Sequence, residues 1–122
     1  MITEDYVSFE TAKLLKEKGF NEPCYSSYKK GVLSLDSYTM SNTEFNKNAI
    51  SAPTLQMAMK WLRDEKNIHI KVHCSGNRNY LVYAQSLVTA FPDFCIESAT
   101  CSFNTYEKAC EAAIKYCLIN LI

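Results

Sequence analysis

The segment Ile68-His-Ile-Lys-Val-His-Cys74 decides how this chain folds, because its apolar and polar residues alternate without a break. Successive side chains of a β-strand point to opposite faces of the sheet, so this alternation predicts a strand with one buried face. The side chains predicted to point into the interior are those of Ile68, Ile70, Val72 and Cys74. The side chains predicted to point into solvent are those of His69, Lys71 and His73.

A hairpin is expected to extend from this strand. Turn-forming residues follow it, and residues 79–87 supply a returning strand. A two-residue Gly76-Asn77 loop would place His73 opposite Tyr80. A three-residue loop would shift the pairing by one residue and put Leu81 on the outer face. The sequence leaves both registers open.

The first helix is expected at residues 9–18, ahead of this hairpin. The side chain of Ser8 can accept a hydrogen bond from an amide of the first turn. Gly19 can adopt the left-handed conformation that ends a helix, and Phe20 would then fold back onto Leu15.

Two further helices are expected at residues 55–66 and 106–121, where apolar residues recur at helical spacing. Thr54 and Thr105 can cap them, and the last helix is expected to dock across the sheet. Trp61 lies at the edge of the apolar face of the middle helix, so we predict that it is half-buried.

A second hairpin is expected between the first two helices, where residues 24–28 and 32–35 flank Lys29-Lys30-Gly31. Residues 36–52 and 89–104 are left without an assignment, apart from a short strand at 94–97. Together these elements predict a single α+β domain over residues 1–122. It contains an antiparallel sheet of about four strands, formed by two hairpins, packed with three helices in the order α-β-β-α-β-β-α.

Charge and composition restrict the class of protein. The 122 residues include 13 Lys and Arg against 13 Asp and Glu, so the formal net charge is zero. A balanced charge gives no electrostatic field to hold the phosphates of a nucleic acid. No apolar run is long enough to cross a membrane, and no basic and apolar leader opens the chain. We therefore expect a cytoplasmic protein whose cysteines are reduced.

Neither metal binding nor disulfide bonding is predicted by the spacing of the cysteines, which are Cys24, Cys74, Cys95, Cys101, Cys110 and Cys117. None of them forms the closely spaced pair that is typical of a zinc site. His69 and His73 are about 13 Å apart on a strand, too far to share one ion. Cys110 and Cys117 are about 10 Å apart on a helix, beyond the reach of a disulfide. We expect no metal and no cofactor.

The sequence contains no recognisable catalytic motif. Glycine occurs only at positions 19, 31 and 76, so no glycine-rich loop can hold a phosphate. The carboxylates are scattered, and no serine lies in a Gly-x-Ser-x-Gly setting. We therefore predict that the protein is not an enzyme.

The outward-facing side chains of the 68–87 hairpin form a candidate binding surface. It consists of His69, Lys71, His73, Arg78 and Tyr80, with Tyr83 on the same returning strand. Cationic and aromatic side chains of this kind can contact an anion or a base. An ordinary solvated sheet face has the same composition, so the pattern alone does not separate the two interpretations.

Three functions are consistent with the sequence. The favoured hypothesis is a non-enzymatic accessory protein that binds another protein, since the chain has eight Tyr, six Phe and one Trp, more than a small core must bury. The second is a nucleic-acid-contacting module that uses Lys29, Lys30, Lys71, His73, Arg78 and Tyr80. The third is a small enzyme of unknown type. Ile119 and Ile122 leave an apolar edge on the last helix, so a homodimer is a further expectation.

Three stretches resemble a group of small proteins encoded by phages, prophages and mobile elements of gut Bacteroidales. They are YVSFETAKLLKEKGF with EPC (6–20, 22–24), APTLQMAMKWLR with NIHI (52–63, 67–70) and TYEKACEAAIKYCL (105–118). The chain departs from the group at Lys108, where an acidic residue would complete a capping box, and at Ile119, where a charged residue is expected. The resemblance implies a bacterial cytoplasm and a mobile-element accessory role, with segments 36–52 and 75–103 as the variable part. It assigns no functional residue.

Overall fold

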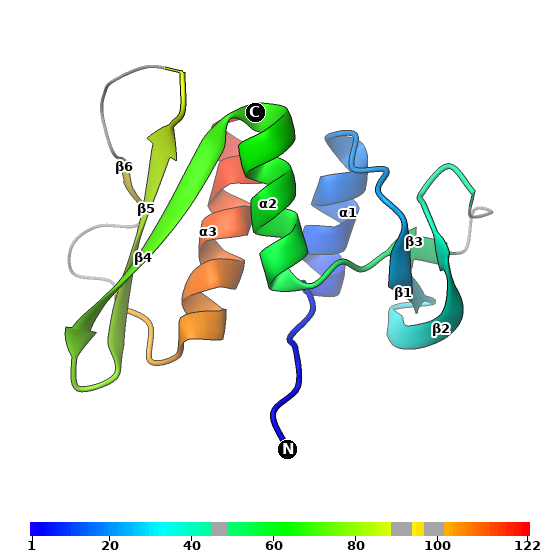
Figure 1. The fold of residues 1–122 in the computed structure, drawn as a ribbon, viewed down its shortest axis with the longest axis horizontal. Helices are drawn as coiled ribbons and strands as arrows, with labels where there is room; N and C mark the ends of the chain where they lie inside the picture. The colour runs from blue at the N-terminus through cyan, green and yellow to red at the C-terminus, as the bar shows by residue number, and fades with distance from the viewer. Residues whose placement is uncertain (45–48, 89–93, 97–101) are drawn as a thin grey trace. The chain divides into compact units, whose positions relative to one another are not determined.

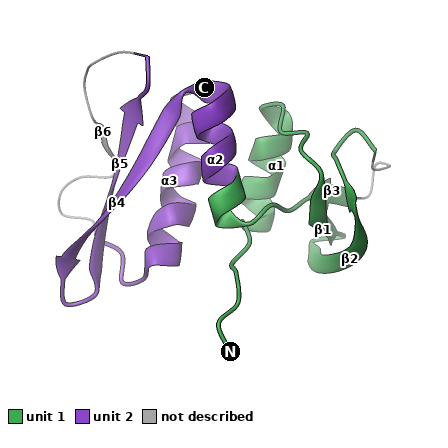
Figure 2. Cartoon of the chain, viewed as in Figure 1, with its two compact units in different colours: residues 1–57 green, residues 58–122 purple. Residues whose placement is uncertain are grey.

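The computed structural model describes residues 1–44, 49–88 and 102–122, together with the backbone of residues 94–96. These residues form three helices and six strands in two antiparallel sheets (Figure 1). The α+β class, the three helices and the two hairpins of the predicted order are therefore confirmed. The chain divides into two compact units, residues 1–57 and 58–122 (Figure 2). A single domain over residues 1–122 stays a prediction.

The sequence predicted one sheet, whereas the two hairpins lie in separate three-stranded sheets of order β2-β1-β3 and β4-β5-β6. Each hairpin gains one short strand from its own unit. β3 (Ala49–Ser51) pairs with β1, and β6 (Phe94–Ile96) pairs with β5. The strands β1, β2 and β3 belong to residues 1–57 and the strands β4, β5 and β6 to residues 58–122, so each sheet forms within its own unit.

In the first unit, α1 (Phe9–Glu17) has the predicted capping residues and ends one residue before the predicted Lys18, which is its C-cap. The Ser8 side chain accepts a hydrogen bond from the Thr11 amide at 3.2 Å. Gly19 has a φ of +97°, and the Phe20 amide donates to the Leu15 carbonyl at 2.9 Å, which is the bond that closes a Schellman motif. Phe20 and Leu15 are both buried.

β1 (Cys24–Lys29) and β2 (Val32–Met40) form the first hairpin, as predicted. Lys29 pairs with Val32, so the connection is the two residues Lys30 and Gly31, with φ values of 53° and 77°. Two consecutive positive φ values are typical of the type I′ turn, whose twist matches that of the strands.

Asn42 organises part of the polar segment 36–52 that the sequence left without an assignment. Its side-chain amide is buried, donates to the Phe20 carbonyl at 2.7 Å and accepts from the Ser51 amide at 2.9 Å. This one side chain therefore fixes the chain after β2 to the end of α1 and to β3. Residues 45–48 lie outside the described part of the chain.

α2 (Leu55–Lys66) crosses from the first unit into the second. The Thr54 hydroxyl accepts from the Met57 amide at 3.2 Å, which confirms the predicted cap. Trp61 was predicted to be half-buried, and this was wrong, since only 6% of its surface is exposed. The Lys66 ammonium lies over its ring at 5.4 Å from the centroid, a cation–π contact that the helical pattern alone does not reveal.

In the second unit, β4 (Ile68–Gly76) pairs with β5 (Asn79–Ser86), and α3 (Tyr106–Asn120) packs on both strands. α3 begins as predicted, because the Thr105 hydroxyl accepts from the Lys108 amide at 3.1 Å. The buried side chains of this unit include Ile68, Ile70, Val82, Ala84, Cys110, Ala113, Ile114, Cys117 and Leu118. The predicted docking of the last helix on the sheet is therefore confirmed.

The alternation that predicted β4 fails at its outer end. Cys74 was predicted to point into the interior but is exposed. It pairs with Tyr80, and the Tyr80 ring meets Tyr106, the first residue of α3, with ring centroids 6.2 Å apart. The helix begins at this level of the sheet, so it does not extend over Cys74.

Removal of the Asn42 amide should destabilise the protein. We expect Asn42→Ala to lower the free energy of unfolding by about 1–3 kcal/mol, because a buried carbonyl and a buried amide lose their partner. The measurement is urea denaturation followed by circular dichroism. The matched control is Asn21→Ala, which removes an exposed bond to the Thr43 amide at 2.8 Å and should cost less than about 0.5 kcal/mol. Equal losses in the two variants would contradict the role of Asn42.

Candidate binding surface

The register of the β4–β5 hairpin determines which side chains share a face. His73 pairs with Leu81, and Val72 pairs with Val82. The turn is Asn77-Arg78, with φ values of 51° and 57°, and a bulge lies between Cys74 and Gly76. Of the two alternatives that the sequence left open, the two-residue Gly76-Asn77 loop is therefore not the one that forms. The shifted register is the one observed, and the bulge at Ser75 produces it in place of a three-residue loop.

The outer face of the hairpin lies opposite the face that carries the buried Ile70, Val82 and Ala84. Cross-strand partners point to the same face, so the outer face is made of three pairs. These pairs are His69 with Gln85, Lys71 with Tyr83, and His73 with Leu81.

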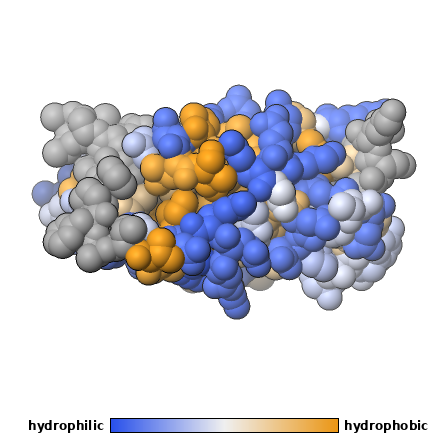
Figure 3. Space-filling view, turned by 90° about the horizontal axis from the view of Figure 1, so that it is seen from above, coloured by the Kyte–Doolittle hydropathy of each residue, from blue (hydrophilic) through white to orange (hydrophobic). Residues whose placement is uncertain are grey.

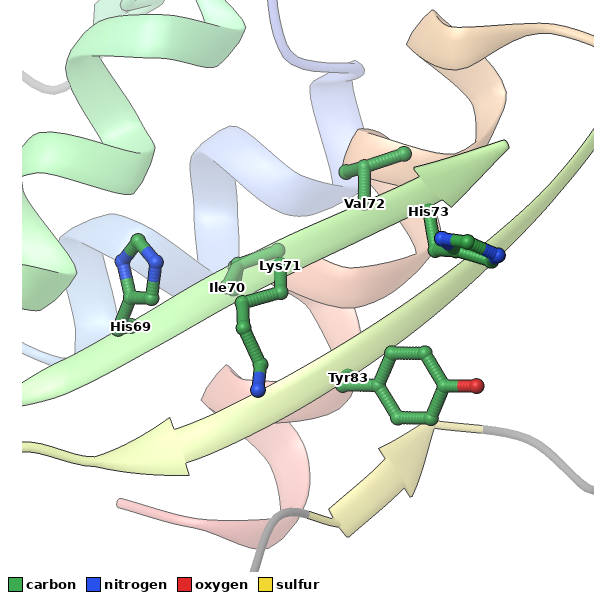
Figure 4. Close-up of a pocket in the computed structure, with 6 residues that line it drawn as sticks. All are labelled: His69, Ile70, Lys71, Val72, His73 and Tyr83. Carbon is green, nitrogen blue, oxygen red and sulfur yellow. The ribbon is translucent and has the colours of Figure 1, made fainter. Parts of the chain in front are cut away.

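Three of the five predicted surface residues lie together, and two lie elsewhere. His69, Lys71 and His73 line one open groove of about 640 Å³, together with Ile70, Val72 and Tyr83 (Figure 4). Arg78 is exposed in the turn and does not line this groove. Tyr80 was predicted to belong to the surface, and this was wrong, because its partner Cys74 shares the face of Ile70.

Tyr83 takes the place that the sequence gave to Tyr80. Figure 4 shows Lys71 extending toward β5, with His73 and Tyr83 at one end of the groove and His69 at the other. Only the shifted register puts Tyr83 opposite Lys71. The bulge that produces this register needs one extra residue in the turn region, and the Ser-Gly-Asn-Arg-Asn run is the only signal for it in the sequence.

The chemistry of this groove favours hydrogen-bond acceptors and anions. Its side chains offer an ammonium group, two imidazoles and a phenol, and none of the six lining residues is acidic. The side chains of Ile70 and Val72 point to the opposite face of the strand, so these two residues border the groove through their backbone. An extended segment that carries carboxylates and carbonyl groups would meet complementary donors here.

The four described cysteines are free thiols, and three of them are poor nucleophiles. Burial raises the pKa of Cys24 to about 11, with a smaller contribution from Glu22. Burial also raises the pKa of Cys110 to about 11 and that of Cys117 to about 12. These thiols remain protonated at neutral pH and act as small apolar side chains. Cys95 and Cys101 lie outside the residues whose side chains are described.

Two further findings concern sites elsewhere in the described ranges. Among those residues, no group of three or more His, Cys, Asp or Glu side chains could hold a metal ion. None of the described helices has the length and apolar character needed to cross a membrane.

The remaining residues of the nucleic-acid hypothesis belong to the first unit. Lys29 and Lys30 lie at the turn of the β1–β2 hairpin, where the Lys29 ammonium pairs with the Asp36 carboxylate at 3.1 Å. This ion pair neutralises one of the six basic and aromatic residues of that set. Tyr80, a second member, is turned to the face that carries Ile70.

Apolar side chains are exposed at a different place in the second unit. Figure 3, which views the molecule from above, shows apolar surface among polar residues. The large apolar residues exposed at the ends of β5 and α3 are Leu87, Val88, Ile119 and Ile122. The exposed edge predicted for the last helix is therefore present, and the homodimer that it suggested stays a prediction.

Comparison with known proteins adds no assignment, since no family model, no curated protein and no solved structure matches this chain.

The register predicts which engineered cysteine can bridge to Cys74. We expect Tyr80→Cys to form a disulfide with Cys74 on mild oxidation, because directly opposed residues of an antiparallel pair lie within disulfide reach. Asn79→Cys is the matched control, since it would face Cys74 only in the unshifted register. Peptide mass spectrometry identifies the bridge, and a bridge in the Asn79 variant alone would show that the register is wrong.

The burial of the thiols predicts unequal labelling. At pH 8 a pKa near 11 leaves roughly one thiol in a thousand ionised, so Cys24, Cys110 and Cys117 should react with iodoacetamide at least ~10-fold more slowly than Cys74. Rates should rise with pH, because the thiolate is the reactive form. Quantitative peptide mass spectrometry gives each rate, and the urea-unfolded chain is the control, in which the rates should converge. Equal rates in the folded chain would contradict the burial.

Proposed function

We propose that this protein is a non-enzymatic accessory protein of a phage or mobile element, and that it acts in the bacterial cytoplasm by binding another protein. The observation that carries this proposal is the groove along β4, with Lys71, His73 and Tyr83 on its outer face. The resemblance of the three helical stretches to proteins of Bacteroidales phages and prophages supplies the biological setting.

The side chains of the groove support a binding role over a catalytic one. An acid–base catalyst of the common type pairs an imidazole with a carboxylate, or with a nucleophilic hydroxyl or thiol. The six lining residues include two imidazoles, but they include no carboxylate, serine or cysteine. An ammonium group with imidazoles and a phenol, which can donate hydrogen bonds, fits the recognition of a ligand.

A protein partner is favoured over a nucleic acid by charge. Binding to phosphates depends on several Lys and Arg contacts acting together. The groove has one lysine, and the whole chain has a formal net charge of zero. A phenol and imidazoles beside a single cation instead suit the polar and aromatic composition of a protein interface.

Reversal of the charge in the groove tests the proposal. We expect tagged wild-type protein to capture a reproducible partner from a Bacteroidales lysate, and Lys71→Glu to lose most of that capture because its carboxylate repels acidic groups. The control is Lys60→Glu, which changes an exposed lysine of α2 and should capture normally. Quantitative mass spectrometry compares the three samples.

Two results would contradict this function. One is a partner retained equally by Lys71→Glu and Lys60→Glu, or no reproducible partner at all. The other is binding to a single-stranded oligonucleotide that falls steeply with salt and depends on Lys71, because this is the behaviour of a nucleic-acid-contacting module.

A further inference from the structure

The β2 strand of the first unit is an open and apolar sheet edge. It is an outer strand in the order β2-β1-β3, and its nine residues pair only with β1 in the described part of the chain. Val32 and Leu35 are 67% and 68% exposed, and Leu33 is 38% exposed. A long apolar edge of this kind is a template for another strand, and natural proteins normally cover or charge it.

The backbone of this edge is oriented toward a further strand at Leu33 and Leu35. In a hairpin with a two-residue turn, the flanking pair Lys29 and Val32 exchanges hydrogen bonds. Bonding direction alternates along a strand, so Ser34 also turns its backbone toward β1. Leu33 and Leu35 therefore present their N–H and C=O groups to the open side, and no described residue bonds to them.

We infer that β2 pairs with β2 of a second copy of this chain, in an antiparallel register centred on Ser34. In this register Leu33 of each copy lies opposite Leu35 of the other. Both leucines share one face of the strand, so the pairing joins four leucines in one apolar cluster. The two Ser34 residues face each other on the opposite face, and both copies use the same surface.

Charge is compatible with this self-pairing. The charged residue on this part of β2 is Asp36, whose side chain is 12% exposed and is paired with Lys29 at 3.1 Å. The edge strand β4 of the other sheet differs, because Lys71 lies near its centre. Antiparallel self-pairing of β4 would place that lysine opposite a second lysine or an imidazole, which disfavours it.

The opposite edge of the first sheet limits the assembly to two copies. It is β3, which is only three residues long, and short edge strands resist further pairing. The two-fold pairing of β2 occupies the long edge of the first sheet in both copies. A closed dimer therefore results, and not a growing sheet. Because the contact is one strand wide, we expect the dimer to dissociate on dilution.

Sedimentation equilibrium over the micromolar range tests this inference. We expect the wild-type mass to rise toward twice that of the chain with concentration, and Leu35→Lys to stay monomeric. Leu35 is largely exposed, so this variant should fold, which matching circular dichroism melts would verify. The control is Ile119→Lys, which changes an apolar residue of α3 that is 55% exposed and should still dimerise.

A cysteine at the proposed axis tests the register. We expect Ser34→Cys, made together with Cys74→Ser, to form a disulfide between two copies on mild oxidation, because opposed residues at the axis are within disulfide reach. Val32→Cys in the same background is the control and should not bridge to itself.

Three results would overturn the inference. They are a wild-type chain that stays monomeric, a Leu35→Lys variant that still dimerises, or loss of the dimer in Ile119→Lys alone. This dimer does not depend on the groove of β4, so its failure leaves the proposed partner binding untouched, and Lys71→Glu should dimerise as wild type does.

Discussion

The pairing of β4 with β5 is the constraint on which the second unit and its candidate surface depend. A one-residue slip of one strand would carry all its side chains to the other face. The bulge at Ser75 fixes the observed pairing, in which Val72 meets Val82 and both strands turn apolar residues toward α3. Because successive side chains point to opposite faces, burial of that face also determines which side chains lie on the outer face. Lys71 and Tyr83 are opposed on the outer face because the residues that alternate with them, Ile70, Val82 and Ala84, are buried on the inner face.

The first unit depends on hydrogen bonds that join segments distant in sequence. Gly19 and Phe20 end α1 with local bonds, and the carbonyl of Phe20 then accepts from the Asn42 side chain. Asn42 also accepts from Ser51 in β3. A single buried amide thus connects three parts of the unit. This explains how a segment rich in Ser, Thr and Asn, with few apolar residues, can be part of an ordered sheet.

The two units present surfaces of opposite chemistry. The groove of β4 has a cation, imidazoles and a phenol, whereas the edge of β2 has leucines and backbone groups open to a further strand. The first suits a partner with complementary polar groups, and the second suits an identical strand. If both proposals hold, a dimer carries two grooves. A partner with repeated binding segments would then be held more tightly than one with a single segment, because the second contact is intramolecular.

The sequence by itself determined the helix ends at Ser8, Gly19, Thr54 and Thr105, the two hairpins, and the alternation of Ile68 to Lys71, because each of these depends on bonds and spacings within a few residues. Tertiary structure alone decided the rest. The bulge at Ser75 exchanged Tyr80 for Tyr83 on the outer face, and Trp61 became buried where half-burial was expected. Asn42 ordered the chain around it, and short strands β3 and β6 completed two sheets where one was expected. Each of these outcomes depends on which distant groups meet, and residue spacing carries no information about such contacts until the chain has folded.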